Sequence, residues 1–414
     1  MISPRLKRIG LILGVIILGV GVFVAAWFLF FQPFVTVTRP TNGNTNTATG
    51  TLPNVNSAGP TNGNTNNPIA RGPSTLPTPS DVANGDLTLV SDVSSTPVTA
   101  PVIGPDGKSI LFYSDLDDRF LRLDPATGTL VDLTSQKFPD VKKITWAPDG
   151  ERAVLEFPDD RKVIYDFSNR RQYTLPTQAQ DFSFSTDSDQ LAYEYVGTGP
   201  DESFLVTAKA DGSGSTAVAK LADKTANVQV AWSPSKEVVG FFRQSANASQ
   251  QEIVLIGQHQ ENFKTITTDG KGFQGKWTPD GSKVLYTVYS EATNWNPELH
   301  LVFARGNETG RGNVNLGLQT SIEKCVFNRS GTHAYCAVPD LLERGSGLYP
   351  EFSANAKDAV YTINLNSGAV SPIALPVTGS LERFSIDRLV LSPDETVLYF
   401  TDRGTGKLVK IRLK

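Results

Sequence analysis

The sequence predicts an all-β protein: a seven-bladed β-propeller of four-stranded antiparallel blades, preceded by one N-terminal transmembrane helix and a disordered linker. Three observations carry this prediction. They are a long uncharged apolar run, a stretch rich in Asn, Thr, Gly and Pro, and a turn motif with seven copies. Glycine and proline number 35 and 26 among 414 residues, which suits a chain with many turns.

The first element is a membrane anchor. Residues 9–31 contain no charged side chain, and as a helix they would extend about 34 Å, enough to cross a bilayer core. Arg5, Lys7 and Arg8 precede the run, so the positive-inside rule places residues 1–8 in the cytoplasm and the rest of the chain outside it. A cleaved signal peptide is the alternative, but its apolar region usually spans about 7–15 residues and ends at small residues.

The second element is a linker over residues 32–85. It repeats the heptad PTNGNTN at 40–46 and 60–66 and holds few apolar side chains, so it cannot offset the entropy lost on ordering. We expect a flexible tether that holds the following domain away from the membrane. A glycosylated stalk is the alternative for a segment of this composition.

The third element, residues 86–414, carries the repeats. A motif recurs about every 47 residues: a large apolar residue, one further residue and then a Pro-Asp-Gly or related turn. This period is typical of a propeller blade. In the Pro-Asp-Gly copies, proline fixes φ at the start of the turn and glycine supplies a positive φ, and short apolar strands flank the turns. The large residue two positions before the proline position is predicted to lie in the core between blades, and a ligand box is the alternative. These residues are Ile103, Trp146, Phe184, Trp232, Trp277, Phe327 and Leu391.

The ends of this domain are predicted to close the ring. The seventh unit stops after its third strand, at 408–413, and residues 86–93 form an additional strand before the first unit. Pairing of the two would complete the seventh blade, because an open ring leaves unpaired strand edges.

The repeats resemble those of the TolB-type propeller family, whose core motif is W-S-P-D-G-K. The residues that carry the resemblance are WAPDG at 146–150, WSP at 232–234, WTPDGSK at 277–283 and SPD at 392–394. The resemblance implies a propeller over roughly 330 residues. It leaves the activity open, because such repeats occur in binding proteins, peptidase gating domains and some lyases. A membrane helix and a spacer stand here where TolB itself has an α/β domain.

No catalytic, metal or cofactor motif is found. The sequence lacks a nucleophile elbow, a P-loop and a dinucleotide-binding fingerprint. His259, His300 and His333 fall in three different units, without a second ligand at metal spacing. Two acidic turns, at 115–118 and 187–189, could offer oxygens to calcium, but neither has the full loop pattern.

The two cysteines are predicted to form a disulfide. Cys325 and Cys336 flank the sixth turn, and a hairpin centred on that turn places them directly opposite each other. An exported location permits oxidation. Two reduced core cysteines are the alternative.

The candidate binding face lies opposite the Pro-Asp-Gly turns. Insertions are expected there at 194–203, 243–250, 290–298, 339–358 and 376–387, and loops of this length are often functional. The third and fourth insertions carry aromatic and aliphatic side chains that belong to no repeat position, and such side chains are favoured anchors at interfaces. The candidate residues are Tyr289, Trp295, Leu341, Leu342, Leu348, Tyr349 and Phe352. The alternative is that they pack down on the blades.

These observations favour a membrane-anchored extracytoplasmic propeller that acts as a non-catalytic protein-binding or scaffold module of the cell envelope. The first 85 residues carry net charge +4 and the remainder net −8, which argues against a nucleic-acid partner. The expected partners are an extracytoplasmic or envelope protein and, through the helix, the membrane. A propeller enzyme, a lyase or hydrolase acting on envelope glycan or peptide, is the alternative, and a purely structural envelope protein is a third possibility.

Overall fold

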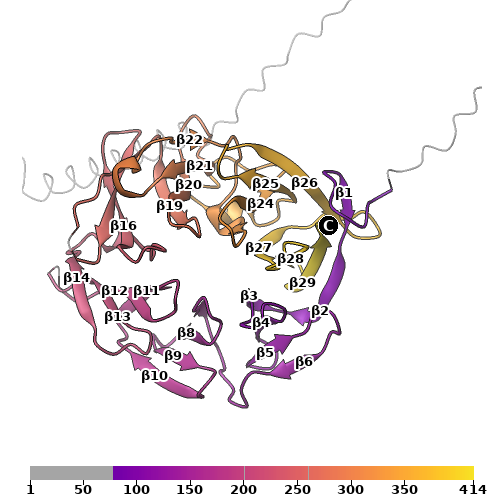
Figure 1. Cartoon of the computed structure of the whole chain (residues 1–414), viewed down its shortest axis with the longest axis horizontal. Coiled ribbons are helices and arrows are strands. Elements are labelled where there is room, and N and C mark those ends of the chain that lie inside the picture. The colour runs from indigo at the N-terminus through magenta and orange to yellow at the C-terminus, as the bar shows by residue number, and fades with distance from the viewer. Residues whose placement is uncertain (1–77, 200, 260) are drawn as a thin grey trace, which may run out of the picture. The chain divides into compact units, whose positions relative to one another are not determined.

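A computed structural model describes residues 78–199, 201–259 and 261–414. Seven sheets surround a central axis, so the predicted seven-bladed propeller is confirmed (Figure 1). The membrane helix expected at 9–31 and the linker up to residue 77 lie outside the described residues. Within the described ranges, no helix combines the length and apolar character that crossing a bilayer requires.

Each blade consists of four antiparallel strands, and the first three blades are consecutive in sequence. Blade one comprises β3 (Thr99–Ile103), β4 (Ile110–Ser114), β5 (Arg119–Leu123) and β6 (Leu130–Asp132). Blade two comprises β7 (Lys143–Trp146), β8 (Arg152–Glu156), β9 (Lys162–Asp166) and β10 (Arg171–Leu175). Blade three comprises β11 (Ala179–Phe184), β12 (Gln190–Tyr195), β13 (Phe204–Lys209) and β14 (Thr216–Lys220).

The next three blades follow the same order, with four 3-10 turns in their connections: η1 (Thr225–Asn227), η2 (Gly306–Glu308), η3 (Ile322–Lys324) and η4 (Pro350–Ser353). Blade four comprises β15 (Val228–Val230), β16 (Val238–Ser245), β17 (Gln251–Gly257) and β18 (Ile266–Thr268). Blade five comprises β19 (Lys271–Trp277), β20 (Lys283–Tyr289), β21 (Glu298–Phe303) and β22 (Val314–Asn315). Blade six comprises β23 (Cys325–Phe327), β24 (His333–Pro339), β25 (Asp358–Asn364) and β26 (Val370–Val377).

Blade seven joins the two ends of the propeller. It comprises β27 (Ile386–Leu391), β28 (Val397–Asp402), β29 (Lys407–Arg412) and, as its outer strand, β2 (Ser91–Pro97). β2 runs antiparallel to β29. The buried Ser94 hydroxyl also accepts a hydrogen bond from the Leu408 N–H at 2.9 Å. The ring is therefore closed by pairing the first and last parts of the domain.

The closing strand differs from the one expected at 86–93. That segment divides in two, because β1 (Leu87–Leu89) pairs in parallel with β26 of blade six before the chain passes to blade seven. Earlier residues join as well. The Gly85 N–H donates to Ile373 O and the Ala83 N–H donates to Arg412 O, each at 2.8 Å. Contacts with the propeller thus begin a few residues before Asp86.

The seven repeat positions lie in or against the core. Phe184, Trp232 and Leu391 are buried, and Ile103, Trp146, Trp277 and Phe327 pack on buried clusters. Two of the tryptophans bridge neighbouring blades in the same manner. The Trp146 indole donates to Ala100 O at 2.9 Å, and the Trp277 indole donates to Ala231 O at 3.3 Å.

In the turns of the motif, the residue four positions after the large apolar residue has a positive φ. Gly150 has φ +70° and Gly281 φ +67°, as a tight turn requires. Lys236 and Glu395 occupy the same position in degenerate copies with φ +62° and +56°. The backbone geometry is therefore retained where the glycine is lost. Each of these turns joins the first strand of its blade to the second, so all of them lie on one face of the ring.

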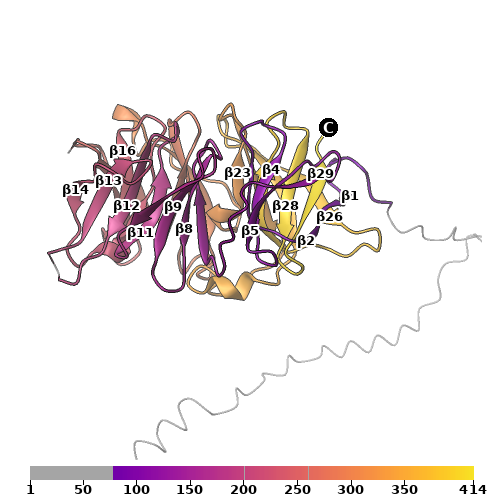
Figure 2. The same cartoon turned by 90° about the horizontal axis from the view of Figure 1, so that it is seen from below.

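The insertions lie on the opposite face of the ring. Figure 2 shows η4, the orange-gold helical turn of the longest insertion, at the lower edge of the molecule. This insertion joins β24 to β25 in blade six, and a shorter one joins β20 to β21 in blade five.

Candidate functional site

The loops of blades five and six form one surface. In the blade-six loop, the Gly345 N–H donates to Asn294 O at 2.9 Å and the Gly347 N–H donates to Trp295 O at 2.8 Å. The Ser346 N–H also reaches the Asn296 side-chain oxygen at 3.3 Å. These bonds fasten the longer loop to its neighbour.

The seven candidate residues divide between the base and the outside of this surface. Tyr289 and Trp295 are half-buried, with ring centroids 6.2 Å apart, and Leu342 is also half-buried. The other four are exposed: Leu341 by 80%, Tyr349 by 53%, Leu348 by 46% and Phe352 by 44%. We call the seven together the recognition face: Tyr289, Trp295, Leu341, Leu342, Leu348, Tyr349 and Phe352.

A cavity of about 310 Å³ opens beside these loops. Its walls come from strands of blades four and five, from η3 and from the blade-six loop. Two cationic side chains, Arg243 and Lys324, line it, and none of the described lining residues carries a carboxylate. Gln274, Thr287 and Tyr289 supply further polar groups, and Leu342 and Leu348 supply an apolar wall.

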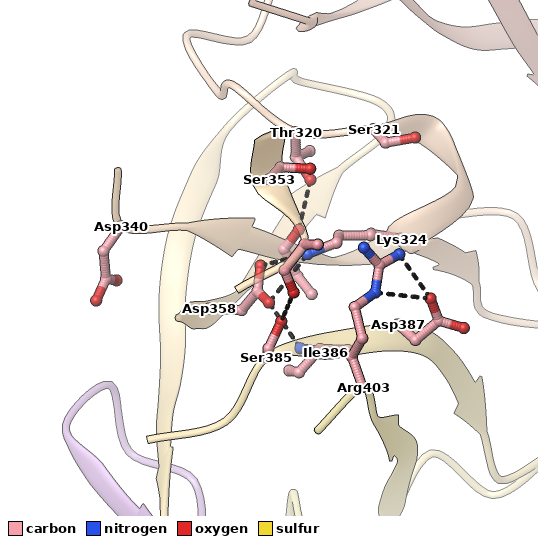
Figure 3. A network of polar contacts seen from close by, with 12 residues as sticks. Thr320, Ser321, Lys324, Asp340, Ser353, Asp358, Ser385, Ile386, Asp387 and Arg403 are labelled. Carbon is pink, nitrogen blue, oxygen red and sulfur yellow. Dashed lines mark hydrogen bonds and ion pairs between the residues drawn. The ribbon is translucent and has the colours of Figure 1, made fainter. Parts of the chain in front are cut away.

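Lys324 belongs to a buried ion pair (Figure 3). Its ammonium donates to both carboxylate oxygens of Asp358, at 2.9 and 3.0 Å, and the two side chains are 7% and 0% exposed. The Ile386 N–H donates to the same carboxylate at 2.7 Å. Burial raises the pKa of Asp358, although Lys324 opposes this shift. The pair joins η3 and β25 of blade six to β27 of blade seven.

Arg243, at the end of β16, is fixed by backbone carbonyl groups. Its guanidinium donates to Ala226 O at 2.7 Å and Phe273 O at 2.9 Å, and also to the carbonyl oxygens of Asn227 and Val228. Within the described ranges, no carboxylate lies within 4 Å of it. Burial lowers the pKa of Arg243, and the guanidinium remains a cation.

Glu194 is a second perturbed group near Arg243. Its side chain is buried, its Oε2 accepts a hydrogen bond from the Gln180 amide at 3.1 Å, and its Oε1 has no partner among the described residues. Burial raises the pKa of Glu194 to about 7, and the hydrogen bond from Gln180 opposes the shift. Glu194 therefore holds a proton in part of the population at neutral pH.

Two further cavities lie away from the recognition face. One of about 970 Å³ lies among the Pro-Asp-Gly turns, between blades one and seven, with Arg122, Asp124 and Tyr399 in its wall. Another, of about 570 Å³, is lined by inner strands of several blades and holds Lys276 and Arg388. Sequence reasoning missed both, because their residues come together only through the ring.

The cysteines of blade six are directly opposite each other across β23 and β24, and a disulfide joins Cys325 to Cys336. Their Cα atoms are 4.1 Å apart. This is the pairing that the hairpin register predicted. Both residues are buried in the core between blades five and six, so the bond lies within the packed interior of the ring.

Potential metal ligands are dispersed in the described part of the chain. No three side chains among its His, Cys, Asp and Glu residues come close enough to hold a metal ion together. His300 stacks on Tyr286 with ring centroids 5.2 Å apart, and burial lowers its pKa. In the acidic turns, the Asp117 carboxylate accepts from the Ser114 hydroxyl and Asp187 pairs with Lys236.

Known structures share the fold at low sequence identity. A structure of oligogalacturonate lyase in complex with manganese aligns with a TM-score of 0.55 and 15% identity, over 76% of this chain and 88% of the lyase. The β-propeller domain of Cps50 (Swd1) from Myceliophteria thermophila aligns with a TM-score of 0.52 and 10% identity, over 78% of this chain and 100% of that domain. Neither a protein-family model nor a curated protein matches the sequence. The similarity therefore establishes the propeller fold alone.

Proposed function

We propose that this chain is a non-catalytic binding module that holds a protein partner on the recognition face. The observation that carries the proposal is the exposure of four large apolar side chains on one loop, Leu341, Leu348, Tyr349 and Phe352. Exposed apolar groups gathered in one place mark interaction surfaces, and aromatic side chains are favoured anchors there. Since the loop is bonded to blade five, little ordering entropy would be lost on binding.

The proposed location is the outer side of the cytoplasmic membrane, with the N-terminus inside. The uncharged run at 9–31 and the basic residues before it support this location. The partner is then an extracytoplasmic or envelope protein, and the acidic composition of residues 86–414 disfavours nucleic acid. The resemblance of the repeats to those of the TolB-type family is consistent with a binding role, and it rests on the motif alone.

Affinity purification of the full chain from its own cells tests the proposal. Wild-type protein is compared with Leu341→Ser/Tyr349→Ser and with the control Leu116→Ser, which changes another exposed leucine, 69% exposed, on blade one. We expect the double variant to lose a partner that the control retains. Equal recovery by all three proteins would refute the recognition face as the binding site.

A propeller enzyme is the second candidate. Glu194, with a pKa of about 7, lies near the cation of Arg243, and an acid–base group beside a cation is a common catalytic arrangement. One structural neighbour is a lyase, although the likeness extends only to the fold. Turnover of envelope glycan or peptide by the purified chain, lost in Glu194→Gln, would favour this candidate over the binding module.

A further inference from the structure

The cavity beside the recognition face has an unbalanced charge. Lys324 is neutralised by Asp358, whereas Arg243 has no ion-pair partner among the described residues. Asp181 and Glu194 act on Arg243 only at longer range. Asp181 already accepts a hydrogen bond from the Val230 N–H at 2.9 Å, and Glu194 is partly protonated at neutral pH. An anion in the cavity would supply the missing charge.

The donors in the cavity are already held in place. Four of the five guanidinium N–H groups of Arg243 are bound by backbone carbonyl groups of blades four and five, so one N–H remains for a ligand. The ammonium of Lys324 makes two bonds to Asp358 and has a third hydrogen. Fixed donors of this kind bind an anion with little reorganisation.

Two neutral polar groups of the cavity lie side by side on neighbouring strands. Gln274 and Thr287 are directly opposite residues of β19 and β20. Neither side chain is hydrogen-bonded to another described residue, and both line the cavity. Both can therefore donate to a ligand oxygen. Leu348 and Leu342 form the side of the cavity that continues into the recognition face.

We propose that this cavity binds a carboxylate of the partner's peptide, carried by an acidic side chain or by the C-terminus. This inference rests on the proposed function and adds to it the chemistry of the partner. A peptide suits the site better than a charged sugar, because the cavity wall continues into the exposed leucine and aromatic side chains of one loop. The volume of about 310 Å³ is at the small end of ligand pockets and suits one or two side chains.

The test uses the full chain and an array of short random peptides. Each peptide is presented with its acidic residues and with Asn and Gln in their place, and with a free or an amidated C-terminus. The variant Gln274→Glu adds a negative charge to the cavity through an exposed side chain that is not hydrogen-bonded to any described residue, so folding is retained. Gln172→Glu makes the same change on the exposed outer strand of blade two and is the matched control.

We expect peptides that bind wild type and Gln172→Glu to bind Gln274→Glu roughly tenfold more weakly or worse. The same peptides should lose binding when their carboxylate is replaced. Loss in the Asn and Gln form identifies an acidic side chain as the bound group, and loss in the amidated form identifies the C-terminus. Equal binding to Gln274→Glu, or unchanged binding of the carboxylate-free forms, would overturn the proposal. If glucuronate competes for the cavity and no peptide depends on its carboxylate for binding, the proposal would also be overturned, and the ligand would be a charged sugar.

The two failures are distinguishable. Peptides that lose binding in Tyr349→Ser but tolerate Gln274→Glu would overturn the carboxylate site and leave the recognition face intact. An array in which no bound peptide depends on Tyr349 or Gln274 would overturn both.

Discussion

The carbonyl oxygen of Trp295 accepts a hydrogen bond from the Gly347 N–H at 2.8 Å, so a loop of blade five holds a loop of blade six. Trp295 and the preceding Asn294 have φ values of +59° and +55°. A left-handed backbone is unusual for a bulky residue and costs about 1–3 kcal/mol, so the surrounding structure must maintain it. Such strain is often found at binding sites. The recognition face is therefore a preorganised surface.

Residues at the base and on the outside of this face should respond differently to substitution. We expect Tyr349→Ser to change the free energy of unfolding by less than about 0.5 kcal/mol, because the ring is 53% exposed. Trp295→Ala should destabilise by roughly 1–3 kcal/mol, because it removes a half-buried ring that lies beside Tyr289. Urea denaturation of both variants measures the difference. A larger loss in Tyr349→Ser would mean that the ring supports the fold.

The hydroxyl of Ser94 should add to the stability that β2 gives the ring through its pairing with β29. Ser94→Ala leaves the Leu408 N–H without its acceptor, so we expect a loss of about 1–3 kcal/mol and a lower melting temperature. Ser95→Ala is the matched control, because that neighbour on the same strand is exposed. Equal melting temperatures of Ser94→Ala and wild type would show that the Ser94 hydroxyl adds nothing measurable to the backbone pairing of β2 with β29.

The propeller could be predicted because each repeat carries its own turn chemistry. A residue with positive φ lies four positions after each large apolar residue, and five of the seven turns also carry proline. Trp146 and Trp277 repeat the same bond to the preceding blade. The closing strand was placed a few residues too early. The alternation of residues 86–93 fits one strand, and nothing local reveals that Leu87–Leu89 pairs with a different blade.

The disulfide should contribute to stability in an oxidising compartment. Its closed loop is short, with a sequence separation of 11, so the chain-entropy model gives about 2–3 kcal/mol. We expect no reactive thiol in the unreduced, denatured chain, and we expect dithiothreitol to lower the melting temperature. The variant Cys325→Ala/Cys336→Ala should melt at one temperature with or without dithiothreitol. Two reactive thiols in the untreated protein would contradict the bond.

The buried pair of Lys324 and Asp358 should be sensitive to removal of one partner. Lys324→Met leaves the Asp358 carboxylate buried without its cation, and we expect a loss of about 3–5 kcal/mol. Lys324→Met/Asp358→Asn should recover much of that loss, because the neutral amide can still accept from the Ile386 N–H. Denaturation of both single variants and the double variant measures the coupling. Simple additivity of the two substitutions would contradict a direct ion pair.

Glu194 should make the fold less stable as pH rises. Its pKa is raised from an ordinary 4.5 to about 7 in the folded chain. Between these values the folded state holds a proton that the unfolded state has released, so stability falls as pH increases and levels off above about 7. We expect Glu194→Gln to be more stable than wild type by about 1–3 kcal/mol at pH 8 and nearly equal to it near pH 4.5. A pH-independent difference in stability between Glu194→Gln and wild type would contradict the raised pKa of Glu194.

Only part of the candidate site could be predicted from the sequence. Leu341 and Tyr349 fit no repeat position, so the sequence places them in a long loop. Both side chains are exposed there, because the loop projects from the blades. The cation of Arg243 gave no sequence signal, because its neighbours at Phe273 and Val228 come from separate strands. The pairing of Lys324 with Asp358 likewise requires the folded blade.

Photo-crosslinking in living cells tests the central claim most directly. A benzoylphenylalanine placed at Tyr349 of the full chain is compared with one at Leu116, which is exposed on blade one. If the recognition face holds a protein partner, Tyr349 should give one dominant protein adduct that Leu116 does not give, and Leu341→Ser in the same chain should reduce it. If the crosslinker at position 349 gives no protein adduct, or gives the same adducts as the crosslinker at position 116, the recognition face does not hold a protein partner.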